Sequence, residues 1–188
     1  MLQCGIKWSN IPNMRRISSS YSARETLPDG RCLYIRAIRP SDRKRLHDEF
    51  HKLSAASVRD RFFNVKLDLT PQELTFFTEV GFSMHVALVA ELEIGSGRRP
   101  VDVGRFVRKQ DAPDHSEFAI TVSDEMAGQG IGKLLLKQLI HCARRLGVHH
   151  LDASVLPQNS RMTKLLHHTG LPVKSKIEDG ILTYTLDI

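Results

Sequence analysis

The sequence has few cysteines, few aromatic residues and no long hydrophobic run. Its three cysteines, Cys4, Cys32 and Cys142, are scattered and form no Cys-x-x-Cys pair, so we expect neither a disulfide framework nor a thiolate zinc site. The same cysteine pattern predicts a location in the reducing cytoplasm. No segment reaches the roughly 18 apolar residues of a membrane span, so we expect no membrane insertion. Aromatic residues make up only 6% of the chain, which disfavours a nucleic-acid-binding sheet of stacking rings.

The first 26 residues contain no acidic residue before Glu25 and include a serine-rich run at 18–22. This composition is typical of an organellar transit peptide, but the residues show little amphipathic periodicity. We therefore predict a flexible N-terminal extension at 1–26, either a disordered tail or the result of an upstream start site.

The remaining residues, 27–188, are expected to form one domain. The whole chain of 188 residues is 41% apolar and 26% charged, which is enough for one sizeable hydrophobic core. Its formal net charge of +6 suits a polyanionic cofactor, an acidic protein surface or a nucleic acid equally well. Charge alone therefore does not choose among these partners.

Alternating and helical patterns follow one another along the domain. A capping box with proline at 70–73 marks one helix start, and Gly147 follows another helix as a C-terminal cap. Strands are predicted at 32–38, 85–94, 101–109, 116–122, 149–156, 173–177 and 181–186, and helices at 42–53, 57–63, 70–81, 130–146 and 159–169. This order predicts a three-layer α+β fold, with a mixed, mainly antiparallel sheet flanked by helices and one right-handed β-α-β crossover over 117–156.

Three alternating glycines, Gly128, Gly130 and Gly132, lie after a predicted strand and directly before an apolar helix. Glycines let the backbone approach an anion closely, and the unpaired amides of a first helical turn point at it. The spacing excludes a Walker A loop, because Lys133 is followed by Leu134, and a Rossmann fingerprint, which needs glycine at position 133. The glycines therefore predict a phosphate-binding loop of another kind.

The loop from Ala127 to Gly132 resembles the acetyl-CoA loop of the GNAT superfamily of N-acetyltransferases, Gln/Arg-x-x-Gly-x-Gly/Ala. Ala127 departs from the family's leading Gln or Arg, for which Gln129 offers a partial substitute. The following segment is similar to the family's Asn-x-x-Ala-x-x-Leu-Tyr-x-x-x-Gly-Phe helix, with matching spacing at Asn159, Met162, Leu165 and Gly170 and departures at Leu166 and Leu171.

The N-terminal half resembles the acetyltransferase domain of bacterial protein lysine acetyltransferases. The resemblance lies in Leu-Pro-Asp-Gly at 27–30, in the segment 35–40 and in the segment 59–63. Together the similar segments cover about residues 27–188, and they imply a GNAT-like fold.

In this family two parallel strands part, and the pantetheine arm of acetyl-CoA enters between them. The resemblance implies that acetyl-CoA binds here between 116–122 and 149–155, with its pyrophosphate on the amides of 128–133. The implied binding residues are Ile120, Thr121, Val122, Ala127, Gly128, Gln129, Gly130, Ile131, Gly132, Lys133, Asn159, Met162 and Leu165.

Glu117 is the candidate catalytic base, because the strand Ser-Glu-Phe-Ala-Ile resembles the one that bears the catalytic glutamate in protein lysine acetyltransferases. An ordinary glutamate, with a pKa of about 4.3, is a weak base, so we expect Glu117 to be buried against Phe118 or Phe106, with or without a relaying water. Lesser candidates are Glu125, Glu178 and Asp179. The family's tyrosine acid is Leu166 here, and Tyr184 or water is the expected replacement.

Several of these residues have simpler structural explanations. Asn159 is a good helix N-cap, Glu117 also fits a solvated strand end, and Cys142 lies on the apolar face of a helix. The adjacent histidines at 149–150 and 167–168 point apart, so no metal is expected.

The favoured function is acetyl transfer from acetyl-CoA to a protein lysine by direct attack in a ternary complex. Alternatives are acetylation of a small amine, a catalytically silent CoA-binding sensor and, last, a nucleic-acid binder. The oligomeric state does not follow from the sequence.

Overall fold

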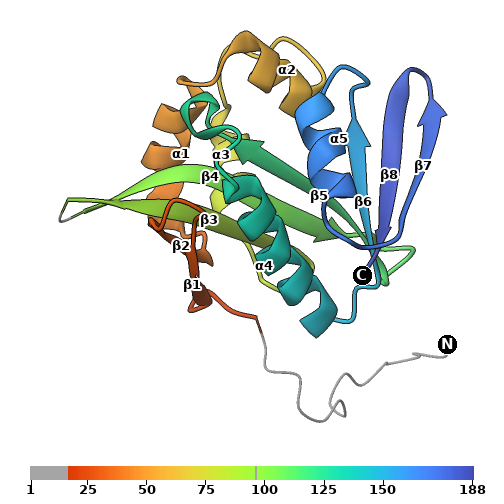
Figure 1. Cartoon of the computed structure of the whole chain (residues 1–188), viewed down its shortest axis with the longest axis horizontal. Helices are drawn as coiled ribbons and strands as arrows, with labels where there is room; N and C mark the ends of the chain where they lie inside the picture. Colours follow the sequence, from red (N-terminus) through yellow and green to blue (C-terminus); the bar gives the residue numbers. More distant parts are fainter. Residues whose placement is uncertain (1–16, 96) are drawn as a thin grey trace, which may run out of the picture.

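The computed structural model describes residues 17–95 and 97–188, and these form an eight-stranded mixed sheet with helices on both faces (Figure 1). The strands are β1 (Ser22–Thr26), β2 (Cys32–Ala37), β3 (His85–Ile94), β4 (Gly97–Arg108), β5 (His115–Val122), β6 (His150–Val155), β7 (Val173–Glu178) and β8 (Ile181–Asp187). Their order in the sheet is β1-β2-β3-β4-β5-β6-β8-β7, and every neighbouring pair is antiparallel except β5 and β6.

Five α-helices complete the three layers: α1 (Arg43–Phe50), α2 (Ala55–Phe62), α3 (Pro71–Thr78), α4 (Ile131–Arg145) and α5 (Ser160–His167). The main core lies between the sheet and the helices α4 and α5, and it includes Leu135, Leu139 and Leu166. A smaller core, with Phe50, Val58 and Phe77, joins α1, α2 and α3 on the other face. The predicted fold class is confirmed, as is the crossover from β5 through α4 to β6.

Helix α4 follows directly from its sequence. Leu135 and Leu139 are fully buried, and burial of each such side chain contributes roughly 1.5–3 kcal/mol. Gly147 follows the helix at φ 74°, and the amide of Val148 donates to the carbonyl of Ala143 at 3.0 Å, which satisfies one of the last carbonyls of the helix. The predicted cap at Gly147 is therefore confirmed.

Helices α1 and α3 are shorter than predicted, whereas α2 begins and ends earlier than predicted. The capping box of Thr70 and Glu73 forms, but α3 ends at Thr78 rather than near position 81. Residues Pro40–Asp42 form a 3₁₀ turn before α1, and α1 ends at Phe50. Ser54 caps α2 by accepting from the amide of Ser57, so this helix begins two residues earlier than predicted.

The sheet begins inside the predicted N-terminal extension. Strand β1 pairs with β2 from Ser22 to Thr26, and Ile17 is buried in the main core. Residues 17–26 thus belong to the folded domain, because β1 extends the sheet by one antiparallel strand. The rest of the predicted extension, residues 1–16, lies outside the described residues, as does position 96 of the β3–β4 turn.

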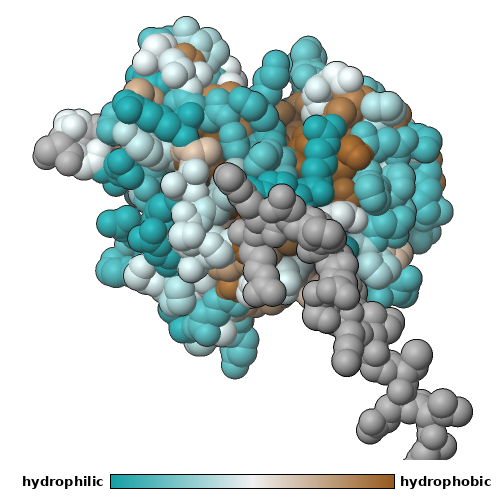
Figure 2. Space-filling model, turned by 90° about the horizontal axis from the view of Figure 1, so that it is seen from below, coloured by the Kyte–Doolittle hydropathy of each residue, from teal (hydrophilic) through white to brown (hydrophobic). Residues whose placement is uncertain are grey.

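Hydrophilic residues cover most of the face seen in Figure 2, and hydrophobic residues gather in small areas between them. In the described part of the chain, no helix combines the length and apolar character needed to cross a bilayer. Cys32 and Cys142 are free thiols, while Cys4 lies outside the described residues.

Candidate active site

Strands β5 and β6 pair over only three residues and then part. The paired residues run from His115 to Glu117 on β5 and from His150 to Asp152 on β6. Beyond them β5 stays paired with β4 as far as Val122, and β6 stays paired with β8 as far as Val155. Alternate peptide groups of a strand point to opposite sides, so those that β5 directs away from β4 face the opening.

The glycine loop lies at the open end of these strands. Gly128 and Gly130 have φ of 79° and 87°, a conformation that costs other residues energy, and Gly130 is the N-cap of α4. The next three amides, of residues 131–133, lie in the first turn of α4, where the helix offers them no acceptor. A Cβ on Gly132 would lie 3.3 Å from Cγ2 of Val122, so glycine lets α4 start close against β5.

The parted strands and this loop enclose a cleft of about 620 Å³. The cleft brings together every predicted acetyl-CoA-binding residue except Gln129, and it also includes Glu117. Its lining residues are Ser57, Asp60, Arg61, Phe63, Glu117, Phe118, Ala119, Ile120, Thr121, Val122, Met126, Ala127, Gly128, Gly130, Ile131, Gly132, Lys133, Ser154, Asn159, Arg161, Met162, Lys164, Leu165 and His168.

Gln129 does not line the cleft, and its side chain is hydrogen-bonded within the protein. The side-chain NH₂ group of Gln129 donates to the backbone carbonyl of Glu125 at 3.0 Å, and the side-chain oxygen of Gln129 accepts from the guanidinium of Arg31. These bonds join the loop to the β1–β2 turn, so Gln129 holds the loop in place and its side chain does not line the cleft.

Asn159 is both an N-cap and a cleft residue. Its Oδ1 accepts from the amide of Met162 at 3.0 Å, at the start of α5. The cap uses only the oxygen of the side-chain amide, and the NH₂ group of the same side chain is not needed for it. The two roles considered for Asn159 are therefore compatible.

Glu117 lies where β5 and β6 part, and it is exposed rather than buried. The expected packing against Phe118 or Phe106 was wrong, because both rings are buried in the core under α4 and adjacent strand residues point to opposite faces. The charged neighbour of Glu117 is Arg61 of α2 instead. Burial lowers the pKa of Arg61, and the nearby carboxylate of Glu117 opposes that change.

Tyr184 was expected to replace the family's tyrosine acid, whose position is Leu166 here, but Tyr184 does not line the cleft. Leu166 is fully buried, and Tyr184 is also buried, with its hydroxyl 3.5 Å from Oγ1 of Thr163. Of the described residues, the cleft lining includes neither Tyr184 nor the lesser base candidates Glu125, Glu178 and Asp179. Arg99 pairs with Glu125 at 2.9 Å.

Asp124 makes contacts beside the cleft that the sequence did not predict. It lies between β5 and the glycine loop, accepts from the amide of Ser54 at 2.8 Å and from the hydroxyl of Ser57 at 2.7 Å, and pairs with Arg161 at 3.3 Å. Burial would raise the pKa of Asp124, but the hydrogen bonds from Ser54 and Ser57 outweigh it and lower that pKa. No sequence pattern indicates this contact, because Asp124 lies 67 residues from Ser57 along the chain.

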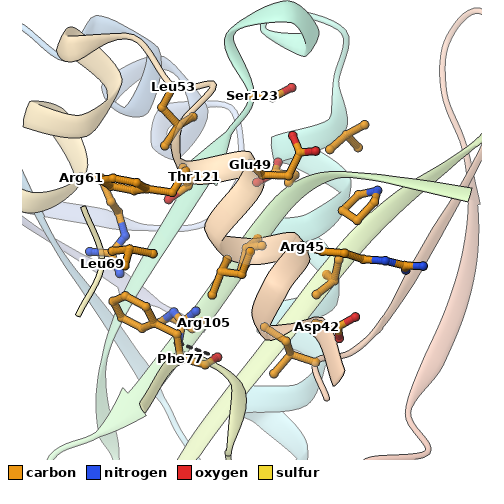
Figure 3. Close-up of a pocket in the computed structure, with 18 of the residues that line it drawn as sticks. Asp42, Arg45, Glu49, Leu53, Arg61, Leu69, Phe77, Arg105, Thr121 and Ser123 are labelled. Carbon is orange, nitrogen blue, oxygen red and sulfur yellow. Dashed lines mark hydrogen bonds between the residues drawn. The ribbon is translucent and has the colours of Figure 1, made fainter. Parts of the chain in front are cut away.

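A second, smaller cavity of about 80 Å³ lies between α1 and the sheet, and it shares Arg61 and Thr121 with the cleft. Figure 3 shows Arg61 and Arg105 on the same side of this cavity as Phe77. The Arg105 guanidinium donates to the carbonyl of Phe77 at 3.2 Å and lies over its ring. Burial, and secondarily the charge of Arg61, lowers the pKa of Arg105 to about 9.

Several basic residues lie close together in the sequence of the N-terminal half: Arg36, Arg39, Arg43, Lys44 and Arg45. Three of them, Arg36, Lys44 and Arg45, form ion pairs. Arg36 pairs with Asp42 at 2.7 Å and with Glu91 at 2.6 Å, and Lys44 pairs with Asp48 at 2.7 Å. The Arg36–Asp42 pair joins β2 to the turn before α1, whereas Arg36 and Glu91 both lie in the sheet and Lys44 and Asp48 both lie in α1.

Three proteins illustrate what this chain is similar to. An acetyltransferase from Pseudomonas aeruginosa is 30% identical over 163 residues, which cover 84% of this chain and 87% of that protein. The acetyltransferase Pat from Mycolicibacterium smegmatis is 30% identical over 141 residues, and the match covers 75% of this chain but only 41% of Pat. The crystal structure of the GNAT domain of S. lividans PAT superposes with a TM-score of 0.81 at 29% identity, covering 89% of this chain and 97% of that domain.

The family model described as the acetyltransferase (GNAT) family matches residues 56–171, which include the parted strands, the glycine loop and Asn159. GNAT acetyltransferases use acetyl-CoA as the acetyl donor. The chain belongs to the GNAT family of acetyltransferases.

Proposed function

We propose that this chain binds acetyl-CoA in the cleft between β5 and β6 and transfers the acetyl group to a protein lysine. The observation that carries the proposal is the parting of β5 from β6 after Glu117 and Asp152, with the glycine loop at the open end. The pyrophosphate binds the amides of 128–133, where the helix dipole adds to the attraction. Lys133, Arg161 and Lys164 line the same cleft and supply positive charge for the phosphates.

Acetyl transfer needs a neutral amine, yet a lysine with a pKa of about 10.4 is neutral in only roughly one molecule in a thousand near pH 7.4. Glu117 takes the proton from the lysine ammonium through a water, since its carboxylate is exposed at the junction of the strands. The amine nitrogen then attacks the thioester carbon. The tetrahedral intermediate loses the extra proton of its nitrogen to solvent and collapses with cleavage of the C–S bond. The CoA thiolate then takes up a proton from solvent.

The surface beside the cleft favours a protein acceptor over a small amine. Phe63 lines the cleft and is 38% exposed, and Val65 and Leu67 in the same segment are 88% and 85% exposed. Exposed large apolar side chains that occur close together in one segment are consistent with a protein-binding surface. The cytoplasm remains the predicted location, and this prediction depends only on the scattered cysteines of the sequence.

Thermal unfolding with and without acetyl-CoA tests the cofactor assignment before any substrate is known. Acetyl-CoA at 100 times its dissociation constant should stabilise the fold by about 2.7 kcal/mol, whereas NAD and ATP should not. No shift at saturating acetyl-CoA would refute the cleft assignment.

Turnover on lysine-containing proteins tests the chemistry. Glu117→Gln should lower kcat by about 10²- to 10⁴-fold with acetyl-CoA binding retained, while Glu125→Gln, outside the cleft lining, should change it little. Equal activity of Glu117→Gln and the parent would remove the base assignment.

Two alternatives remain in view. The first alternative is a small-amine acetyltransferase. In that case the parent protein would acetylate small amines but not lysine-containing proteins. The second alternative is a catalytically silent CoA-binding sensor, because Ala127 and Leu166 depart from the pattern of the family. Such a sensor would bind acetyl-CoA and show no turnover with either class of acceptor.

A further inference from the structure

Two histidines and one aspartate lie close together on the side of the sheet that carries α1, α2 and α3, opposite α4. His47 lies on α1, His51 is the C-cap of α1 one turn later, and Asp68 comes from the segment between α2 and α3. Oδ1 of Asp68 lies 2.8 Å from Nε2 of His47 and 3.2 Å from Nε2 of His51, and the two Nε2 atoms are 3.4 Å apart. Three potential metal-ligand atoms thus form one small triangle.

The size of this triangle matches a metal site. Ligand atoms around a tetrahedral zinc ion with bonds of about 2.0 Å lie roughly 3.3 Å from one another. The three measured separations of 2.8, 3.2 and 3.4 Å are close to this spacing, so an ion could sit above the triangle with little movement of the side chains.

Neighbouring contacts hold the ligands in these positions. The amide of Leu69 donates to Oδ1 of Asp68 at 2.7 Å, which orients the carboxylate. The His51 ring packs edge-on against both His47 and Phe50, at 4.6 and 5.5 Å between ring centroids. Such supporting contacts are typical of metal ligands, whose geometry depends on the groups around them.

The ligand side chains are partly open to solvent, with 35%, 46% and 60% of His47, His51 and Asp68 exposed. An ion can therefore enter directly from solution, and water can fill its fourth position. Two imidazoles and a carboxylate suit zinc and other late first-row divalent ions better than magnesium or calcium, which prefer all-oxygen sites.

We propose that His47, His51 and Asp68 form a Zn²⁺-binding site that joins α1 to the segment between α2 and α3. The ion would stabilise the helices on the proposed acceptor side of the domain, because it links two parts that otherwise meet through the Phe50 core. The expectation of no metal considered only adjacent histidines. The spacing His47-x-x-x-His51 puts both rings on one helix face, and Asp68 follows only after the intervening helix α2.

A second group, Asp114, His115 and His150, is less suitable for an ion. The two rings stack at 4.3 Å with 28° between their planes, so their in-plane lone pairs run nearly side by side and do not converge.

Zinc binding to the full chain, after EDTA treatment and removal of the chelator, tests the proposal. Competition with a chromophoric chelator should find one Zn²⁺ per chain that raises the unfolding temperature, and Co²⁺ in its place should give the visible absorption of a tetrahedral site. His47→Gln, His51→Gln and Asp68→Asn should each weaken binding by about tenfold or more. His149→Asn, an exposed histidine outside the site, should bind as the parent does.

The unfolding temperature of each metal-free variant separates loss of the site from loss of the fold. A variant that folds like the parent but lacks the zinc-induced shift supports the site. Equal zinc affinity in the parent and in the folded His47→Gln, His51→Gln double variant overturns the proposal. So does the absence of zinc binding to the parent at 100-fold molar excess.

Discussion

The hydroxyl of Ser57 on α2 donates to Oδ1 of Asp124, which lies just before the glycine loop, at 2.7 Å. Asp124 also accepts from the amide of Ser54, so one carboxylate fixes the start of α2 against the loop that is proposed to bind acetyl-CoA. Since Arg61 of the same helix lies beside Glu117, this contact positions both halves of the proposed site relative to each other.

Asp124→Ala should destabilise the domain by about 1–3 kcal/mol, because it removes two hydrogen bonds to a charged group and leaves the Ser54 amide without its partner. The exposed pair with Arg161 should add little. Urea unfolding measures the change, with Asp111→Ala, at an exposed position, as the control. A variant as stable as the parent would show that α2 is held by its core contacts alone.

Asn159 allows the cap to be separated from cofactor binding. Asn159→Ala should cost about 1 kcal/mol of stability through the lost cap, whereas Asn159→Ser keeps a capping oxygen and should cost much less. If the side-chain amide also donates to acetyl-CoA, both variants should raise the dissociation constant for acetyl-CoA. Calorimetric titration measures that constant, and normal affinity in Asn159→Ser would limit Asn159 to capping.

The elements of the second half of the fold were predictable because local signals agree there. In α4 the apolar positions recur at helical spacing and glycines stand at both ends, and Asp179 and Gly180 form the turn between β7 and β8 with φ of 50° and 77°. The glycine loop was predictable for the same reason, because its three alternating glycines lie in one short segment.

The missed features depend on contacts between distant segments. Arg61 meets Glu117 only because α2 packs across β5, and Asp124 meets Ser57 over a similar distance along the chain. Glu117 was expected to be buried among aromatic rings because Phe118 is adjacent, but alternation along a strand sends that ring to the opposite face.

Gly104 of β4 lies directly beneath α4, and a side chain there should force the helix away. A Cβ on Gly104 would lie 2.7 Å from Cδ1 of Leu139 and 3.1 Å from Leu135, in a core that is fully buried. Gly104→Ala should therefore cost about 1–3 kcal/mol. Gly81→Ala, where an added Cβ meets nothing within 4 Å, should stay within about 0.5 kcal/mol of the parent in the same denaturation experiment. Similar losses in both variants would contradict the packing argument.

His85 should make the stability of the domain depend on pH below neutrality. Burial, and secondarily the charge of Arg105, lowers the pKa of His85 to about 4. The Arg105 guanidinium lies 3.4 Å from Nε2 of His85 and can only donate, so that nitrogen accepts and the ring is neutral in the folded state.

The unfolded chain takes up a proton at the ordinary histidine pKa of about 6.5, while the folded chain does not until about pH 4. The unfolded state therefore binds more protons between these values, and stability falls as the pH falls through this window, by about 1–3 kcal/mol in total. Urea unfolding at pH 7.5, 6 and 5 measures the slope. His85→Gln should reduce the slope of stability against pH, whatever the variant does to stability at pH 7.5. The control variant His149→Asn should keep the slope of the parent. Equal slopes in the parent and in His85→Gln would assign the pH dependence to other groups.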